Sequence, residues 1–264
     1  MNRENNRHTG RPKKSLGQHF LIDMNIARKI VGALHGSEAA NIIEIGPGKG
    51  VLTKFLLERF GEKLHVVEID SNLAAGLAAD FPELGNRIVQ ADILKAGNEL
   101  YQPSSAIIGN LPYNISSQIF FRVLENRDSI PEMVCMIQKE VADRIRASHG
   151  SKTYGILSVL IQAFYIVEFL FPVSEKVFSP PPKVKSAVIR LTRSGDLPDE
   201  CNDKLFFTIV KAAFNHRRKT MRNSLKSFIP EDISGDGIFN LRPEQLSVRE
   251  FISLTNMLSD FVKR

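Results

Sequence analysis

The chain has 264 residues, which is enough for one large domain or for a medium and a small one, and 43% hydrophobic residues support a buried core. The net charge of +6 favours an anionic partner. The two cysteines, Cys135 and Cys201, lie far apart, which excludes a disulfide framework and a cysteine metal site. The first residues are polar and basic, which excludes a secretory signal, and the apolar runs are interrupted, which excludes a membrane span. Together these features predict a cytoplasmic protein.

The N-terminal region is predicted to be a basic arm followed by a helix. Residues 1–14 carry five Lys or Arg side chains among Asn, Gly and Pro, which indicates a mobile arm that becomes ordered at a partner. After the stretch 15–21, the spacing of Ile26, Ile30 and Leu34 predicts a helix with Asp23 as its N-cap.

A glycine loop comes next. A predicted strand at 41–45 runs into Gly46-Pro47-Gly48-Lys49-Gly50, and helical spacing follows. Glycines let the backbone approach a ligand closely, and a helix N-terminus presents free N–H groups, so this order is typical of nucleotide-binding folds. The loop lacks the ending of a P-loop, and its third glycine comes one residue early for the dinucleotide pattern. We therefore expect a single-nucleoside cofactor without a pyrophosphate.

Polar side chains end the next three predicted strands. Glu68 ends the second strand, 18 residues after Gly50, Asp92 follows the third, and Asn110 ends the fourth. In doubly wound nucleotide-binding folds an acid near the position of Glu68 binds ribose hydroxyls, although Glu68 and Asp70 could instead cap the next helix. Ligands bind outside the carboxyl ends of the strands in such sheets, so we expect one crevice lined by all three side chains and the glycine loop.

The stretch 107–113 ends a buried strand in an amide, a proline and an aromatic ring. Gly109 permits a sharp change of backbone direction, and Pro112 fixes the chain locally. Asn110 and Tyr113 then offer carbonyl acceptors and a flat face, which suit an amino group attached to an aromatic ring. The alternative is a simple strand end and turn.

Further along, the pattern predicts a fifth strand at 133–138, helices over 140–147 and 154–163, and an antiparallel strand pair at 166–170 and 186–191. The stiff, proline-rich connection 178–183 puts Phe178 near the edge of the sheet, where a base-stacking role and a place in the core are equally favoured. A polar linker at 194–199 marks our predicted domain boundary.

The C-terminal third carries the excess positive charge. Residues 205–228 contain six basic side chains and no carboxylate, interleaved with apolar ones, which predicts one or two amphipathic helices with a basic face. We favour contact with RNA phosphates over a merely solvated face. The basic residues are Lys211, Arg217, Arg218, Lys219, Arg222 and Lys226.

This series of motifs resembles that of S-adenosylmethionine-dependent methyltransferases acting on the amino group of adenine. The resemblance rests on Glu44-x-Gly46-x-Gly48-x-Gly50, Glu68, Asp92 and Asn110-Leu111-Pro112-Tyr113. Three further stretches, 17–21, 178–184 and 214–225, narrow it to the ribosomal RNA adenine dimethyltransferases, from about Lys13 to the C-terminus. The basic segment is more similar to the small-subunit enzymes than to the large-subunit relatives that confer antibiotic resistance.

The resemblance implies an α/β fold, with a Rossmann-like class I methyltransferase sheet, mostly parallel with an antiparallel edge strand, in residues 15–195 and a small helical RNA-binding domain in 196–264. It implies S-adenosyl-L-methionine as the cofactor. The implied cofactor-binding residues are His19 and Leu21, through their main chain, and Gly46, Gly48, Glu68 (ribose), Asp92 (adenine) and Asn110 (methyl-bearing end). Many relatives carry Asn at the position of His19.

The resemblance also implies the chemistry and the substrate. The Asn110 side-chain carbonyl and the Leu111 main-chain carbonyl would accept the two amino hydrogens, and Pro112 would hold these carbonyls in place. Tyr113 and Phe178 would clamp the flipped-out base on its two faces. No metal is expected. The implied substrate is two adjacent adenosines in the 3′-terminal hairpin of small-subunit RNA, in a pre-ribosomal small subunit, and we expect a monomer. Large-subunit methylation, DNA adenine methylation and a non-catalytic assembly factor are the alternatives.

Overall fold

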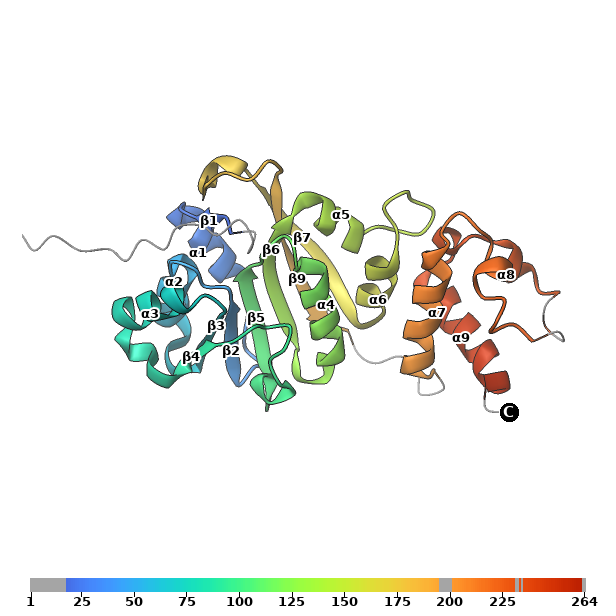
Figure 1. Ribbon diagram of the computed structural model, residues 1–264, viewed down its shortest axis with the longest axis horizontal. Coiled ribbons are helices and arrows are strands. Elements are labelled where there is room, and N and C mark those ends of the chain that lie inside the picture. Colours follow the sequence, from blue (N-terminus) through green and yellow to red (C-terminus); the bar gives the residue numbers. More distant parts are fainter. Residues whose placement is uncertain (1–17, 195–200, 231–232, 234, 263–264) are drawn as a thin grey trace, which may run out of the picture. The chain divides into compact units, whose positions relative to one another are not determined.

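The computed structural model describes residues 18–194, 201–230, 233 and 235–262 (Figure 1). The chain forms two compact units, Met1–Lys139 with Glu168–Thr192, and Glu140–Val167 with Arg193–Arg264. The second unit thus includes a segment that lies before the predicted boundary at 195/196, and that boundary stays a prediction. The predicted basic arm, 1–14, lies outside the described residues.

The first unit is built on a mostly parallel sheet of seven strands in the order β4-β3-β2-β5-β6-β9-β7. The first five strands of this order are parallel, and β9 pairs with β6 in the antiparallel direction. This confirms the predicted Rossmann-like sheet with antiparallel pairing towards one edge. The strands are β2 Asn41–Ile45, β3 Leu64–Glu68, β4 Ile88–Gln90, β5 Ser105–Asn110, β6 Glu132–Gln138, β7 Tyr165–Val173 and β9 Ser186–Arg193.

The helices follow the strands in the alternation that a doubly wound sheet requires (Figure 1). Asp23 caps the first helix as predicted, since its Oδ1 accepts hydrogen bonds from the main-chain N–H of Asn25 and Ile26 at 2.8 and 3.1 Å. None of the described helices is long and apolar enough to cross a membrane. The helices before the C-terminal segment are α1 Met24–Ala33, α2 Val51–Phe60, α3 Ser71–Asp80, α4 Ser116–Glu125, α5 Lys139–Ile145 and α6 Ile156–Phe164.

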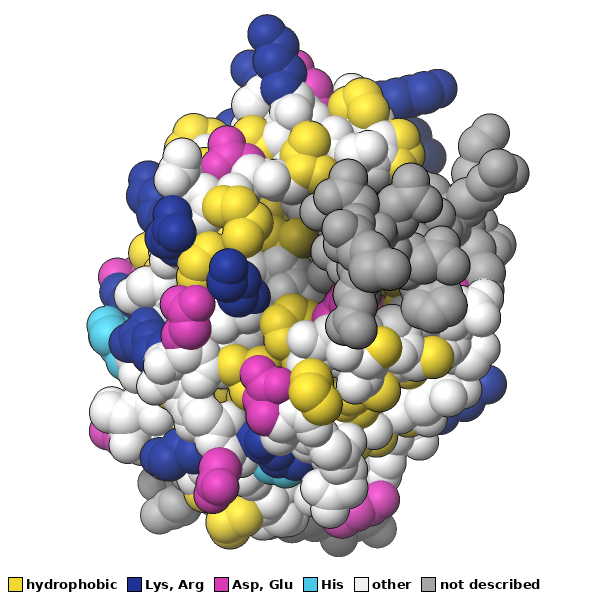
Figure 2. All heavy atoms as spheres, turned by 90° about the vertical axis from the view of Figure 1, so that its left-hand side faces the viewer, with side chains coloured by type: hydrophobic (Ala, Val, Ile, Leu, Met, Phe, Trp, Pro, Cys, Tyr) yellow, Lys and Arg dark blue, Asp and Glu magenta, His cyan; other side chains and the backbone are white. Residues whose placement is uncertain are grey.

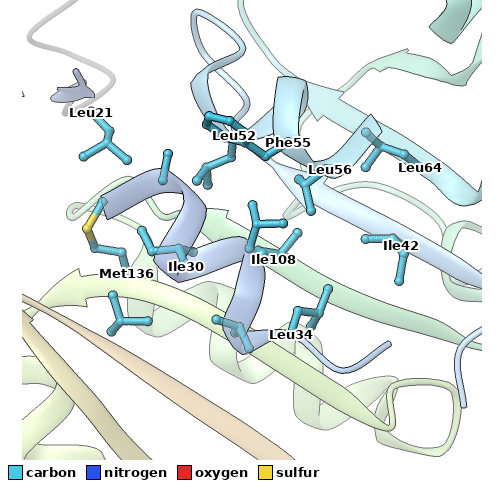
Figure 3. Close-up of a cluster of buried hydrophobic side chains, with 14 of the residues drawn as sticks. Leu21, Ile30, Leu34, Ile42, Leu52, Phe55, Leu56, Leu64, Ile108 and Met136 are labelled. Atoms are coloured by element: carbon cyan, nitrogen blue, oxygen red, sulfur yellow. The ribbon is translucent and has the colours of Figure 1, made fainter. Parts of the chain in front are cut away.

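Buried side chains from α1, α2 and the central strands form one apolar cluster, which is drawn in Figure 3. Ile42 and Ile108 belong to this cluster, whereas their strand neighbours Ile43 and Ile107 point to the opposite face. All four are fully buried, so both faces of the sheet are covered. This explains why the central strands read as continuous apolar runs rather than alternating ones.

Gly109 has a different role from the predicted one. It does not turn the chain, because β5 continues through Asn110, and Gly109 pairs with Cys135 of β6. A Cβ atom at Gly109 would lie 2.5 Å from the main-chain oxygen of Ile45 in β2. Glycine is therefore needed for the close approach of two neighbouring strands, just before both end at the same edge of the sheet.

The part of the second unit that follows β9 is helical. The region 205–228, for which one or two helices were predicted, holds two, α7 Asp203–Asn215 and the short α8 Met221–Ser224. The last helix is α9 Val248–Val262. Helix α7 packs against α6 and α9, with Phe206 edge-on to Phe164 and Phe214 stacked on Phe251. These aromatic contacts build the core of the unit.

Candidate functional site

One cavity of about 190 Å³ lies in the first unit, outside the carboxyl ends of β2, β3, β4 and β5. Every predicted cofactor-binding residue lines it, and so do Leu111, Pro112 and Tyr113. The prediction that four polar strand ends share one crevice is therefore correct in its placement of the residues. On the face of the molecule that Figure 2 shows, Lys and Arg side chains are interspersed with Asp and Glu.

The glycine loop forms one wall of the cavity. Gly46, Gly48 and Gly50 all have positive φ angles, of 65°, 58° and 75°. Side chains are disfavoured there, and a Cβ at Gly48 would also lie 3.0 Å from the ring of Phe20. Glycine is therefore needed at these positions mainly because of the backbone conformation of the loop. This conformation brings the main chain to the cavity.

Glu68 is held in the cavity wall by main-chain donors. Its side chain is 4% exposed, Oε2 accepts a hydrogen bond from the Gly48 N–H at 3.2 Å, and Oε1 accepts one from the Asp70 N–H at 2.9 Å. Burial raises the pKa of this carboxyl. The residue that caps the next helix is Asp70, which accepts from the Asn72 N–H, so Glu68 does not act as the helix cap.

Asp92, His19 and Leu21 also line the cavity. Asp92 is half-buried, and its Oδ1 accepts a hydrogen bond from the Leu94 N–H at 3.0 Å. Leu21 lies in the two-residue strand β1, Phe20–Leu21, which pairs with β8, Phe178–Ser179. His19 comes directly before this strand.

The side-chain amide of Asn110 has a fixed orientation. Its Nδ2 donates a hydrogen bond to the main-chain oxygen of His19 at 2.9 Å, which leaves the Oδ1 carbonyl as the group available to accept. The partner lies 91 residues away in the chain, so Asn110 does not act as a local cap or turn residue. The Leu111 N–H donates to the Met136 oxygen at 3.0 Å, which fixes the next peptide as well.

The ring of Tyr113 is fixed at both ends. Its hydroxyl is 2.5 Å from the Ser186 Oγ at the start of β9, and its ring centroid is 5.4 Å from that of His19. Burial raises the pKa of the phenol, so the hydroxyl remains neutral. Neither contact was predicted, because Ser186 and His19 are far from Tyr113 in the chain.

Phe178 does not line the cavity. Its side chain is 3% exposed and belongs to the apolar cluster of Figure 3, although that figure does not label it. The sequence left a core position and a base-stacking role equally favoured, and the structure has Phe178 in the core. Its predicted contact with the base therefore remains untested.

Glu44 is a buried acid for which no role was predicted beyond its place in the glycine motif. It is 1% exposed and lines the cavity, and Thr53 Oγ1 donates a hydrogen bond to its Oε2 at 2.6 Å. Burial raises the pKa of Glu44 to about 8, with a smaller contribution from the charge of Glu68. An acid within an otherwise apolar strand was the available signal.

Glu44 predicts a specific dependence of stability on pH. Between the ordinary pKa of 4.5 and about 8 the folded protein holds a proton that the unfolded chain releases, so the free energy of unfolding falls as pH rises through this window. Each pH unit costs up to about 1.4 kcal/mol. We expect Glu44→Gln, which cannot ionise, to reduce this slope in urea unfolding at pH 5, 7 and 8.5. The exposed Glu58→Gln is the control, and an unchanged slope in Glu44→Gln would contradict the assignment.

The six predicted RNA-binding residues all lie in the second unit, and they fall into two groups. Lys211, Arg218, Lys219 and Lys226 are exposed. Arg217 and Arg222 are half-buried and donate hydrogen bonds within the unit, to the Ser151 oxygen and to Asn240 Oδ1. The first group therefore has its charge at the surface, while the second also holds the unit together.

Within the residues that the structure describes, no group of three or more His, Cys, Asp or Glu side chains is placed to hold a metal ion. Both cysteines are free and buried, and burial raises the pKa of Cys201 to about 11.

Comparisons with known proteins agree along nearly the whole chain. The model of the ribosomal RNA adenine dimethylase family matches residues 10–258. The protein named ribosomal RNA small subunit methyltransferase A from Bacteroides thetaiotaomicron is 52% identical over 257 residues, which cover 96% of each chain. The protein of the same name from Parabacteroides distasonis is 54% identical over 248 residues, or 93% of each chain.

Two solved structures share the fold. A dimethyladenosine transferase from Plasmodium falciparum aligns with a TM-score of 0.75 and 24% identity, covering 93% of this chain and 98% of that one. The 23S rRNA methyltransferase ErmE aligns with a TM-score of 0.65 and 25% identity, covering 90% and 99%. The fold of this chain is therefore shared with these two structures.

Proposed function

Because the chain belongs to the ribosomal RNA adenine dimethylase family, we propose that its cavity holds S-adenosylmethionine beside a flipped-out adenosine of small-subunit ribosomal RNA. The protein is an S-adenosylmethionine-dependent rRNA adenine dimethyltransferase. The observation that carries the assignment of the site is the single cavity shared by the glycine loop, Glu68, Asp92 and the 110–113 segment.

The side of the cavity that carries the glycine loop, Glu68 and Asp92 fits a nucleoside with an amino-acid side arm. The Glu68 carboxylate is held by two main-chain donors, and its remaining lone pairs can accept both ribose hydroxyls. The half-buried Asp92 can accept from the adenine amino group. Main chain at His19, Leu21 and Gly46 would contact the methionine part. When bound, S-adenosylmethionine supplies a methyl group on a positively charged sulfur.

The segment 110–113 would compensate for the poor nucleophilicity of the adenine amino group. The lone pair of an adenine amino group is delocalised into the ring, so a base alone would not activate it. Asn110 Oδ1 and the Leu111 carbonyl would accept the two amino hydrogens and draw the nitrogen towards a tetrahedral shape. Tyr113 would stack on the base that has left its helix.

The same arrangement allows a second methylation. Each transfer replaces one amino hydrogen by a methyl group, so only one N–H remains for the second step. Two separate acceptors, one of which becomes unused, tolerate this change better than a pocket shaped around the amino group would. The product is dimethyladenosine.

We further propose the finer identity of the substrate and the setting. The exposed basic group of the second unit, Lys211, Arg218, Lys219 and Lys226, would contact RNA phosphates. The target would be two adjacent adenosines in the 3′-terminal hairpin, presented in a pre-ribosomal small subunit and modified by a monomer. Free cysteines support a reducing, cytoplasmic setting.

The test uses ribosomal particles from cells that lack this protein. Purified small subunits should accept labelled methyl groups, and primer extension should stop at two adjacent adenosines near the 3′ end. Large subunits and duplex DNA should remain unlabelled. Label in large subunits would favour the antibiotic-resistance type of activity, and RNA binding without any transfer would favour a non-catalytic assembly factor.

A further inference from the structure

The imidazole of His19 joins segments that surround the acceptor end of the cavity. Its Nδ1 lies 2.9 Å from the main-chain oxygen of Pro180, and its ring centroid lies 5.4 Å from that of Tyr113, with 31° between the planes. These side-chain contacts are separate from the main-chain oxygen of His19, which accepts the hydrogen bond from Asn110.

The contact with Pro180 fixes the imidazole. A carbonyl only accepts, so Nδ1 must carry the proton and donate it. Pro180 directly follows β8, and β8 pairs with β1, with Phe20 opposite Ser179. The hydrogen bond therefore extends this short pairing by one residue and holds the imidazole at a set position next to the ring of Tyr113.

The spacing of the two rings limits where a base can stack. An intervening base needs about 7 Å between the rings, twice a contact distance of about 3.5 Å. The observed 5.4 Å is too short. Since the Tyr113 hydroxyl is also bound to Ser186, the phenol ring cannot swing away without breaking that contact.

We propose that His19 is a positioning residue for the acceptor adenine. Its imidazole occupies one face of Tyr113, so the target base stacks on the opposite face only, and the hydrogen bond to Pro180 keeps it there. This role rests on the proposed function of the cavity. The imidazole of His19 would affect RNA binding and the second methylation, whereas the cofactor would contact only the main chain of His19.

Three substitutions separate the ring from the hydrogen bond. His19→Asn keeps a donor near the position of Nδ1 without the ring, His19→Phe keeps a ring without the donor, and His19→Ala removes both. We expect His19→Ala to raise KM for the RNA about tenfold and to increase the share of monomethylated adenosine, with the cofactor Kd within about twofold of wild type. His19→Asn and His19→Phe should each restore part of the loss. The control is His65→Asn, since His65 bonds the Lys63 oxygen and does not line the cavity.

A second readout does not depend on RNA. The chain has only four tyrosines, so the ring signals of Tyr113 can be assigned in a tyrosine-labelled NMR spectrum by their loss in Tyr113→Phe. They should shift in His19→Ala and His19→Asn, stay near wild type in His19→Phe, and not move in His65→Asn. Unchanged signals in every His19 variant, or a cofactor Kd that rises in step with the RNA KM, would overturn the proposal. If wild-type protein failed to methylate small-subunit RNA, the proposed function would fail while these spectra still decided the position of His19.

Discussion

Asn110→Ala is expected to lower kcat for methyl transfer by about 100- to 1,000-fold, the range seen when one fixed polar group is removed from a reacting centre. The amide is held by the His19 oxygen at 2.9 Å, so its Oδ1 needs no reorganisation to accept an amino hydrogen. Cofactor affinity should fall by less than about tenfold, since Glu68 and the glycine loop remain. Single-turnover transfer to small subunits, with calorimetry for the cofactor, measures both.

Two further variants make this result specific. Asn110→Asp keeps an acceptor oxygen but cannot donate to the His19 carbonyl, so it should fall between wild type and Asn110→Ala. Asn41→Ala is the matched control, because the Asn41 amide also bonds a main-chain oxygen, that of Gln102, at the opposite end of β2 from the cavity. Transfer by Asn110→Ala within threefold of wild type would refute the role given to Asn110.

Glu68→Ala should weaken the binding of S-adenosylmethionine by about 10- to 100-fold, because hydrogen bonds to a charged group contribute about 1.5–3 kcal/mol. At saturating cofactor, kcat should stay close to wild type, since the proposed contact of Glu68 is with the ribose and not with the reacting groups. Calorimetric titration gives the affinity directly.

The loss of cofactor affinity in Glu68→Ala must be distinguished from a loss of structure in the glycine loop. Glu68 also accepts from the N–H of Gly48 and of Asp70, so its loss removes two internal contacts. Glu68→Gln keeps an acceptor oxygen for one of them and should bind the cofactor with intermediate affinity, while thermal unfolding reports any general loss of stability. Glu62→Ala, an exposed acid before the same strand, is the control. Wild-type affinity in Glu68→Ala would remove the carboxylate from the cofactor site.

The part of the site that the sequence predicted is the part fixed by local rules. Glu68 and Asn110 each end a strand and Asp92 follows one, and parallel strands bring their carboxyl ends to one edge, so the shared cavity required no knowledge of side-chain packing. The glycine loop was recognisable for the same reason. The register of β1 with β8, by contrast, left no local signal.

What escaped prediction depends on contacts between distant segments. His19 and Pro180 are 161 residues apart, and Tyr113 and Ser186 are 73 apart, so neither contact can be inferred from spacing. The role of Gly109 was mistaken because it depends on the Ile45 oxygen of a neighbouring strand. The packing of Glu140–Val167 with the C-terminal helices likewise belongs to tertiary structure.

The close approach of Gly109 to Ile45 has a consequence for the reaction geometry. Ile45 is the last residue before the glycine loop, and Gly109 is the last before Asn110, so one backbone contact joins the proposed cofactor side of the cavity to the proposed acceptor side. Under the proposed function, the distance between the methyl donor and the acceptor nitrogen is therefore set by the packing of two neighbouring strands.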